Sequence, residues 1–260
     1  MTTHSPNVVR ALPNGSNIVW MKDGLVEGTG DAVRQKMGWG VLDKRIILIS
    51  EDQQPEELKA LLRQWPDIDR QVTVWPVNGH NSLPTKAACK SLLEITGVDK
   101  IVLHRDGDFM TPEEREVIRE KYEDDAIEFW ITEYSDIEAY FLAPERIARV
   151  SGLKIGLIEQ FFQEIPEELS IDFENAFSSK RQQIVEDKRI YQKRDDAPQI
   201  GDAREKILKG SHDLGIIHGK KFSRRLKHKI NDAGGDVRYI FSVLPDEHNL
   251  ALPLREVLSI

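Results

Sequence analysis

The chain has a single cysteine, Cys89, among 260 residues. One cysteine excludes an intramolecular disulfide, and such usage is typical of proteins in a reducing cytoplasm. The sequence also lacks any apolar run near the roughly 20 residues that cross a bilayer, and it lacks a basic segment followed by an apolar one at its start. We therefore expect a cytoplasmic protein with no membrane partner. Because Cys89 lies in a helix-like segment, we expect it to be buried packing rather than a catalytic thiol.

Two further absences limit which functions we expect of this chain. No G-x-x-x-x-G-K-[ST] motif is present, so we expect no P-loop ATPase in this chain. An excess of positive charge is also missing, since 36 Lys and Arg residues against 44 Asp and Glu residues give a net charge of −8. That balance argues against a wholly electrostatic nucleic-acid binder. It remains compatible with an enzyme whose acidic site is neutralised by divalent cations.

The positive charge that is present is concentrated near the C-terminus. Residues 201–230 hold nine Lys and Arg residues against three acids. Such a stretch is either a solvated helix face or a surface that faces phosphates. On the second interpretation, the nucleic-acid-binding candidates are Lys220, Lys221, Arg224 and Arg225.

Strand-like and helix-like segments alternate from residue 45 to residue 142. Continuous apolar and β-branched runs predict strands at 46–49, 72–77, 100–104 and 127–131. Amphipathic patterns predict helices at 55–65 and 84–96, a helix opened by the capping box Thr111-Pro112-Glu113-Glu114, and a short helix at 136–142. This order predicts an α/β fold with a mostly parallel sheet flanked by helices on both faces.

The flanking segments suggest three regions. Residues 1–40 are expected to form an N-terminal extension with a hairpin near residues 18–28 and a short helix at 31–37. Residues 41–145 form the predicted α/β core, and residues 146–260 a mainly helical C-terminal region. Within that region, the apolar run 237–244 is expected to be a late strand or an apolar helix.

Acidic side chains follow three of the predicted strands. Glu51 follows the first strand, Asp106 and Asp108 the third, and Glu138 lies beyond the fourth. Parallel strands gather such residues at their carboxyl ends, where hard oxygen ligands suit Mg²⁺ or Mn²⁺. Gly107 permits a tight turn that points both aspartates the same way. The plainer interpretation is that these acids are ordinary helix caps and turn residues.

The spacing resembles the Toprim domain, a module of topoisomerases, primases and OLD-family nucleases. In that family a hydrophobic strand ends in a Glu, as the strand before Glu51 does, and a D-x-D motif follows a later strand, as Asp106-Gly107-Asp108 does. The resemblance covers about residues 41–145. It implies a two-metal site in which Mg²⁺ or Mn²⁺ ions promote phosphodiester hydrolysis.

The resemblance also implies roles for individual residues. OLD-type Toprim domains are similar in having a further acid after the next strand, here Glu138, and a lysine beyond the acidic motifs, here Lys220. The implied metal ligands are Glu51, Asp106, Asp108 and Glu138, and the implied catalytic residues are Glu51, Asp106, Asp108 and Lys220.

Some letters depart from the family pattern. Asp52 stands where a glycine usually follows the Glu, and a shifted frame would place His104 at the first Asp of the D-x-D motif. Glu27, in Leu25-Val26-Glu27-Gly28, matches the literal first motif better than Glu51 does, but no buried strand precedes it. We prefer Glu51 as the acid of the first motif because a predicted buried strand precedes it.

The resemblance leads to a functional hypothesis. We expect a metal-dependent nuclease that acts on DNA or RNA. It would work with a separate ABC/AAA-type P-loop ATPase in anti-phage defence. A homodimer would suit an enzyme that cuts two strands. One alternative is a non-catalytic, Toprim-like regulatory or assembly subunit of such a complex. Another is a Mg²⁺-dependent phosphotransfer enzyme of receiver-like or phosphatase-like fold, for which Glu51 would be a poor phosphate acceptor.

Overall fold

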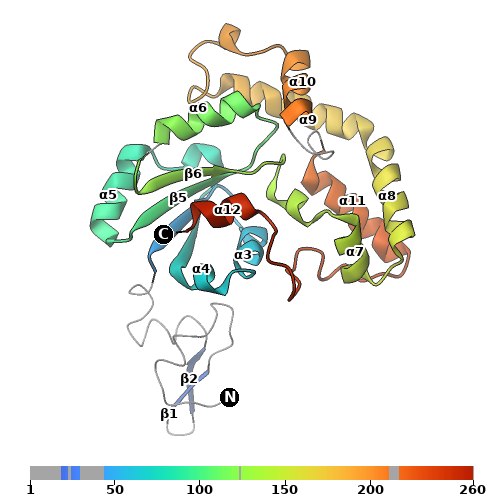
Figure 1. The fold of residues 1–260 in the computed structure, drawn as a ribbon, viewed down its shortest axis with the longest axis horizontal. Coiled ribbons are helices and arrows are strands. Elements are labelled where there is room, and N and C mark those ends of the chain that lie inside the picture. The colour runs from blue at the N-terminus through green and yellow to red at the C-terminus, as the bar shows by residue number, and fades with distance from the viewer. Residues whose placement is uncertain (1–18, 23–24, 30–43, 123, 211–216, 260) are drawn as a thin grey trace.

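The centre of the protein is a parallel sheet of four strands in the order β4-β3-β5-β6. The structure is a computed structural model that describes residues 19–22, 25–29, 44–122, 124–210 and 217–259. The strands of this sheet are β3 (Ile46–Ser50), β4 (Val72–Pro76), β5 (Lys100–Arg105) and β6 (Ile127–Ile131). The predicted α/β class and the parallel sheet are confirmed (Figure 1).

Alternate side chains of the central strands enter two different cores. Ile46 and Leu48 of β3 pack into one cluster, while Ile47 and Ile49 pack into another on the opposite face. Every residue of β3 is buried, which explains the uninterrupted apolar run in its sequence.

Helices cover both faces of the sheet (Figure 1). One face carries α3 (Glu56–Leu62), α4 (Pro66–Gln71) and α12 (Leu252–Val257). The other carries α5 (Lys86–Thr96), α6 (Pro112–Tyr122) and the end of α9 (Ser170–Glu186). Helix α4 was not expected from the sequence. It begins at Pro66, whose fixed φ suits a first helical position.

The predicted capping box at the start of α6 is confirmed. The Thr111 amide donates to Glu114 Oε2 at 2.7 Å, and the Glu114 amide donates to Thr111 Oγ1 at 3.3 Å. Glu114 has a second role that the sequence did not reveal, because Arg181 of α9 binds both of its carboxylate oxygens at 2.6 and 2.8 Å. This buried ion pair ties α6 to α9.

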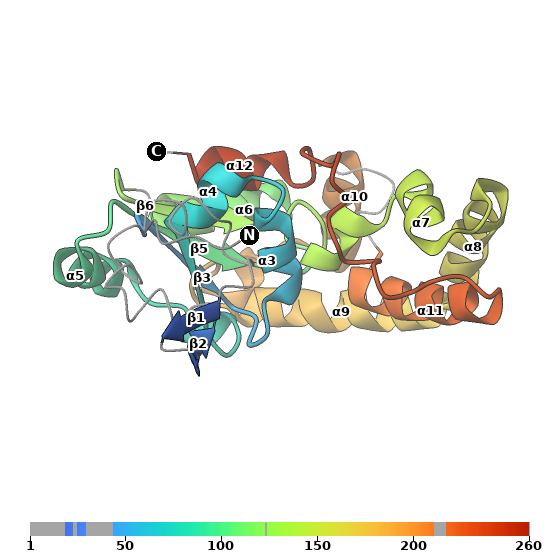
Figure 2. The same ribbon diagram turned by 90° about the horizontal axis from the view of Figure 1, so that it is seen from below.

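The C-terminal half is mainly helical, as predicted. It contains α7 (Pro144–Ser151), α8 (Ile155–Glu168), α9, α10 (Ile200–Gly210) and α11 (Gly219–Asp232). Its core includes Phe173 of α9 and Phe222 of α11. Figure 2 shows α9 running from the sheet into this helical part, and its residues Phe173 and Ile184 accordingly enter different cores. Short 3₁₀ turns are η1 (His80–Ser82), η2 (Ile137–Phe141) and η3 (Arg194–Asp196).

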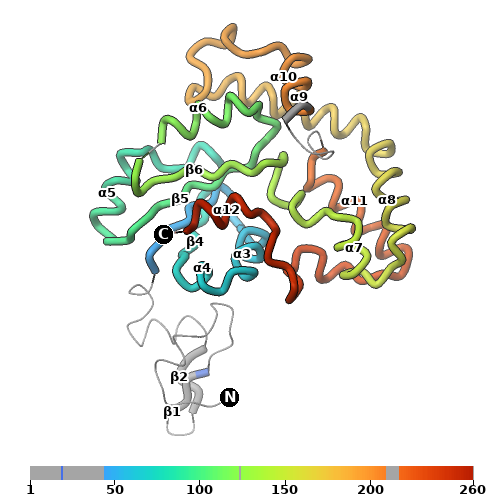
Figure 3. The backbone as a smooth tube through the Cα atoms, in the orientation of Figure 1, coloured from blue at the N-terminus to red at the C-terminus, as the bar shows by residue number. Residues whose placement is uncertain are grey.

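The C-terminal segment returns to the sheet. Leu254 and Leu258 pack in the same cluster as Leu48 of β3 and Leu61 of α3. The path back across the sheet can be followed in Figure 3. A boundary at residues 145 and 146 therefore does not separate two independent cores, because the end of the chain completes the first one.

The expectation for residues 237–244 was wrong, since this run forms turns rather than a strand or helix. The buried guanidinium of Arg146 explains why. It donates to the carbonyl oxygens of Ile240 and Ser242, which a strand or helix would otherwise use for backbone pairing.

At the N-terminus, β1 (Val19–Lys22) and β2 (Leu25–Thr29) pair antiparallel, as the predicted hairpin requires. The helix expected at 31–37 lies outside the described residues. Among the helices that the structure describes, none combines the length and apolar character needed to cross a bilayer.

Candidate metal centre

The acidic residues after β3 and β5 meet at the edge where these parallel strands end, called here the carboxyl edge. The strand register pairs Ser50 with His104, and the Glu51 amide donates to the His104 carbonyl at 3.2 Å. The residues that follow the two strands are therefore neighbours, as the sequence predicted.

The Asp106-Gly107-Asp108 turn is held against the segment after β6. The Gly107 amide donates to Thr132 Oγ1 at 2.7 Å, and the Asp108 amide donates to the Ser135 carbonyl at 2.8 Å. A Cβ on Gly107 would lie 2.1 Å from the Tyr134 carbonyl oxygen, so no other residue fits. Asp108 itself has a φ of 46°, a left-handed conformation that costs energy outside glycine.

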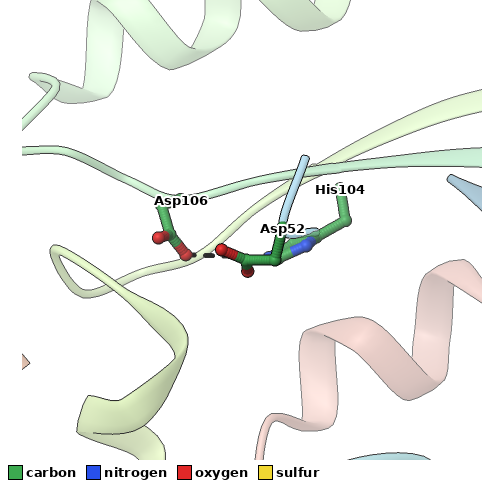
Figure 4. A group of neighbouring side chains, drawn as sticks. All are labelled: Asp52, His104 and Asp106. Atoms are coloured by element: carbon green, nitrogen blue, oxygen red, sulfur yellow. Dashed lines mark ion pairs between the residues drawn. The ribbon is translucent and has the colours of Figure 1, made fainter. Parts of the chain in front are cut away.

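Three side chains at the carboxyl edge converge closely enough to hold one cation. Each of Asp52, His104 and Asp106 offers one ligand atom, and these atoms all lie within 4.8 Å of one another. Figure 4 shows the three side chains turned toward a common point. We call this group the candidate metal centre.

Two atoms of the candidate metal centre are buried without a hydrogen-bond partner among the described residues. They are Asp106 Oδ1 and His104 Nε2, which lie 3.9 Å apart. A buried polar atom without a partner is costly, and a bound cation would satisfy both. The other nitrogen of the His104 ring lies 3.0 Å from Ser50 Oγ, which fixes the orientation of the ring.

The protonation of His104 suits a metal ligand. Burial lowers the pKa of His104 to about 4, so the ring is neutral at pH 7. The pKa of the neighbouring Asp106 carboxyl shifts in the opposite direction. Burial raises the pKa of Asp106 above its usual range, and the repulsion of Asp52 and Glu51 adds to that effect while Lys220 opposes it. An ionised Asp106 is therefore costly unless a cation neutralises it.

Asp52 and His104 were missed as site residues by sequence reasoning. Asp52 stood as a departure from a family glycine, and a lone histidine carries little information. The signal that could have found them is the strand alignment. If Ser50 pairs with His104, then Asp52 and Asp106 each lie two residues beyond that pair, at the same level of the sheet.

Glu51 and Asp108 lie at the same edge but outside the three-residue group. Glu51 turns toward the loop backbone, where its Oε1 accepts from the Asp106 amide at 2.5 Å. Burial, followed by repulsion from Asp108, raises the pKa of Glu51 to about 7. Asp108 Oδ1 forms an ion pair with Lys180 of α9 at 2.7 Å, a partner that the sequence did not suggest.

Glu27 does not belong to the parallel sheet. It lies in β2, which pairs with β1 in a separate two-stranded sheet. Glu51, by contrast, directly follows the buried strand β3, which was the reason for preferring it.

Glu138 approaches the candidate metal centre from η2, which follows β6. The Glu138 side chain is buried, and its Oε2 lies 4.0 Å from Lys220 Nζ. Burial, with repulsion from Asp136, raises the pKa of Glu138 to about 8. Glu138 therefore adds a further carboxyl group that prefers to be neutral or to face a cation.

Lys220 reaches the candidate metal centre from the first turn of α11. Its Nζ lies 3.0 Å from Asp106 Oδ2 and 3.5 Å from Asp52 Oδ1. Burial alone would lower the pKa of Lys220, but attraction by Asp106, Glu138 and Asp52 outweighs it and raises the pKa. The lysine is thus a fixed positive charge among the acids.

The start of α11 is fixed against the loop after β6. The Lys220 amide donates to Asp136 Oδ2 at 3.1 Å, and the Gly219 amide donates to Ser135 Oγ at 3.3 Å. A Cβ on Gly219 would lie 2.0 Å from Asp136 Oδ1, so glycine is needed for this approach. A carboxylate at a helix N-terminus is also favoured by the helix dipole.

The four expected nucleic-acid-binding residues lie on two faces of α11. Lys221 forms an ion pair with Asp172 at 3.3 Å and Arg225 with Glu168 at 2.6 Å, so acids of neighbouring helices neutralise both. Lys220 and Arg224 point the other way, into a cavity beside the candidate metal centre.

The donor set fits a divalent cation. Two carboxylates and a neutral imidazole are hard or borderline ligands, and two of their atoms find no hydrogen-bond partner in the part of the chain that the structure describes. Comparisons with protein-family models, with curated proteins and with solved structures find no match to this chain, so its chemistry is inferred from its residues.

Proposed function

We propose that this chain is a Mg²⁺- or Mn²⁺-dependent nuclease that hydrolyses phosphodiester bonds at the carboxyl edge of its parallel sheet. The observation that supports this most is the convergence of Asp52, His104 and Asp106 within 4.8 Å, with buried atoms that have no partner among the described residues. The resemblance to Toprim domains, carried by the strand before Glu51 and the Asp106-Gly107-Asp108 turn, also supports the proposal, although Asp106 is the one residue that these motifs share with the candidate metal centre.

Each residue has a role in the proposed reaction. Asp52, His104 and Asp106 would hold the cation, which when bound supplies Lewis-acid activation and charge neutralisation at the phosphate. Lys220, already held at 3.0 Å from Asp106, would donate to a phosphate oxygen as negative charge develops.

Glu51 suits the role of general base. Its pKa of about 7 lets it accept a proton from the attacking water near neutral pH. Its Oε1 accepts from the Asp106 amide, and its Oε2 has no hydrogen bond among the residues that the structure describes.

A cleavage assay tests the proposed activity. Labelled DNA and RNA are incubated with the purified chain in Mg²⁺ or Mn²⁺, and with the Asp106→Ala/Asp108→Ala variant. We expect cleavage by the wild type that the variant loses and that EDTA abolishes. A cleavage rate equal in the variant and the wild type would exclude this site as the source of activity.

We propose a separate P-loop ATPase as partner, in an anti-phage defence role, and the site is compatible with a homodimer that cuts two strands. This rests on the OLD-type resemblance and on the lack of a P-loop motif in the sequence. Coexpression with an ATPase encoded beside this chain should give a complex that co-purifies. Two independently eluting proteins, with cleavage unchanged by the ATPase, would contradict the partnership.

One observation favours the alternative of a non-catalytic, Toprim-like regulatory or assembly subunit. Both aspartates of the turn already face a lysine of the chain, since Lys220 pairs with Asp106 and Lys180 pairs with Asp108. If these ammonium groups permanently replace a metal, the site is structural. The two candidates differ in divalent-cation binding, which only the nuclease requires.

A further inference from the structure

A cavity of about 490 Å³ lies beside the candidate metal centre, between α11 and the segment that follows it. We call it the α11 cavity. Its lining residues are Glu138, Lys220, Ser223, Arg224, Lys227, His228, Asn231, Val237 and Phe241. Glu138 and Lys220 line the cavity, and Lys220 also contacts Asp106 of the candidate metal centre, so the cavity lies next to that centre. A nucleic-acid strand bound at the carboxyl edge would therefore have the cavity next to it.

Six of the nine residues that line the α11 cavity have basic, hydroxyl or amide side chains, while apolar atoms supply most of its exposed surface. Lys220, Arg224, Lys227 and His228 follow one another at steps that keep them on one face of α11. Glu138 is the single acid among the lining residues. Val237 and Phe241 supply an apolar wall opposite the helix. This lining suits an anion that carries an organic group.

The cations of the cavity differ from the others on α11. On the opposite face, Lys221, Arg225 and Lys229 each form an ion pair with an acid of α8 or α9, at 3.3, 2.6 and 2.6 Å. Arg224, in contrast, has no ion pair among the residues that the structure describes.

Lys227 also faces the cavity without a carboxylate in ion-pair contact among the described residues. Its Nζ lies 4.0 Å from the centre of the Phe241 ring, and burial lowers its pKa. Glu57 and Glu138 attract Lys227 without an ion-pair contact, and a bound anion would give Arg224 and Lys227 the ion-pair partner that each lacks among the described residues.

We infer that the α11 cavity binds a phosphate group of the nucleic-acid strand next to the phosphodiester bond at the candidate metal centre. Arg224 and Lys227 would bind the phosphate oxygens, because a guanidinium fork and an ammonium group both suit this anion. The apolar wall of Val237 and Phe241 would face the attached nucleoside. The nucleic-acid strand would reach the α11 cavity as the substrate of the candidate metal centre, so this inference rests on the proposed nuclease activity.

Binding measured without catalysis tests the assignment. Fluorescence anisotropy follows labelled single-stranded DNA and RNA of about 12 nucleotides, titrated with the full chain in EDTA. The Arg224→Gln/Lys227→Gln variant removes two cavity cations. The Lys221→Gln/Arg225→Gln variant removes the same charge from the opposite face of the same helix and is the matched control.

We expect the cavity variant to bind about tenfold more weakly and the control to stay within about twofold of the wild type. The slope of log affinity against log salt should become shallower by about 0.7 for the cavity variant, because the contact with one phosphate is lost. The exposed Arg224→Gln single variant should show part of the loss. Unfolding curves show whether each variant folds, so a folding defect cannot be taken for lost binding.

Three outcomes would overturn the inference: equal weakening by both double variants, no weakening by the cavity variants, or equal affinity for a free nucleoside monophosphate and the oligonucleotide. The proposed nuclease fails separately. Binding that depends on Arg224, without cleavage in Mn²⁺, would support the cavity and reject the nuclease. Cleavage by the wild type with unchanged binding by the cavity variants would support the nuclease and reject the role of the cavity.

Discussion

Buried carboxyl groups set the properties of the candidate site at the scale of single residues. Glu51, Asp106 and Glu138 all have raised pKa values, and in each case burial is the largest cause. Each of these groups costs stability when it ionises while buried. The cost is understandable if these residues act on a cation and a phosphate.

Glu138 allows this cost to be measured. Its pKa is raised from 4.5 to about 8 by burial and by Asp136, so the folded state binds its proton more tightly than the unfolded chain. The free energy of unfolding therefore falls as pH rises between these two values. In EDTA at pH 8, Glu138→Gln should raise the free energy of unfolding by about 1 to 3 kcal/mol.

Urea unfolding at pH 5 and pH 8 measures this effect of Glu138, with the exposed Glu133→Gln as the control. The gain from Glu138→Gln should be clearly larger at pH 8 than at pH 5. A gain of the same size at both pH values would show that Glu138 does not titrate with a raised pKa.

Lys220 is the residue whose loss should affect the reaction most selectively. Because its Nζ lies 3.0 Å from Asp106 and beside the proposed phosphate position, Lys220→Ala should lower the cleavage rate by about 10² to 10³. Lys221→Ala, whose side chain pairs with Asp172 instead, should leave the rate within about threefold. Single-turnover cleavage measures both rates. Similar rates for the two variants would remove Lys220 from the reaction.

At the scale of elements, the position of Lys220 depends on how the start of α11 meets the loop after β6. Gly219 makes this approach possible, since a Cβ there would lie 2.0 Å from Asp136 Oδ1. Gly219→Ala should therefore lower the free energy of unfolding by about 1 to 3 kcal/mol and reduce cleavage together with it.

A glycine elsewhere on a helix provides the comparison. Gly156 of α8 has open space around its Cβ position, so Gly156→Ala should be neutral or stabilise by up to about 1 kcal/mol. Thermal unfolding of both variants gives the two values. Equal effects at Gly219 and Gly156 would mean that the contact between α11 and Asp136 does not constrain the helix.

The strands of the sheet could be predicted because each is a short buried apolar run. The capping box could be predicted because Thr111 and Glu114 act on their own neighbours. Other features depend on partners distant in sequence. Arg146 removes residues 237–244 from regular structure, and Lys180 reaches Asp108 from α9. For the site, Asp106 and Asp108 followed from their position after a strand. The role of Asp52 required the register of two strands, which the sequence does not display.

At the scale of the whole molecule, the end of the chain completes the core of the sheet. Leu254 of α12 is fully buried in the cluster that contains Leu48 and Leu61. Leu254→Ala should therefore lower the free energy of unfolding by about 2 to 4 kcal/mol. Leu252, which is 43% exposed on the same helix, is the control. Leu252→Ala should change the free energy of unfolding by no more than about 0.5 kcal/mol.

Urea unfolding followed by far-UV circular dichroism measures both leucine variants. Because α12 and α9 contribute to the cores on the two faces of the sheet, we expect one cooperative transition for the wild type. A value for Leu254→Ala as small as that for Leu252→Ala would show that the C-terminal helix is not part of this core.

The central claim is that Asp52, His104 and Asp106 hold a divalent cation, and calorimetric titration with Mn²⁺ tests it most directly. The wild type should bind Mn²⁺ at micromolar to millimolar concentration, and Asp106→Asn should weaken that binding by about tenfold or more. Asp172→Asn, which removes an acid on the far side of α11, should bind as the wild type does. No Mn²⁺ binding by the wild type, or equal binding by Asp106→Asn, would contradict the claim and favour the regulatory alternative.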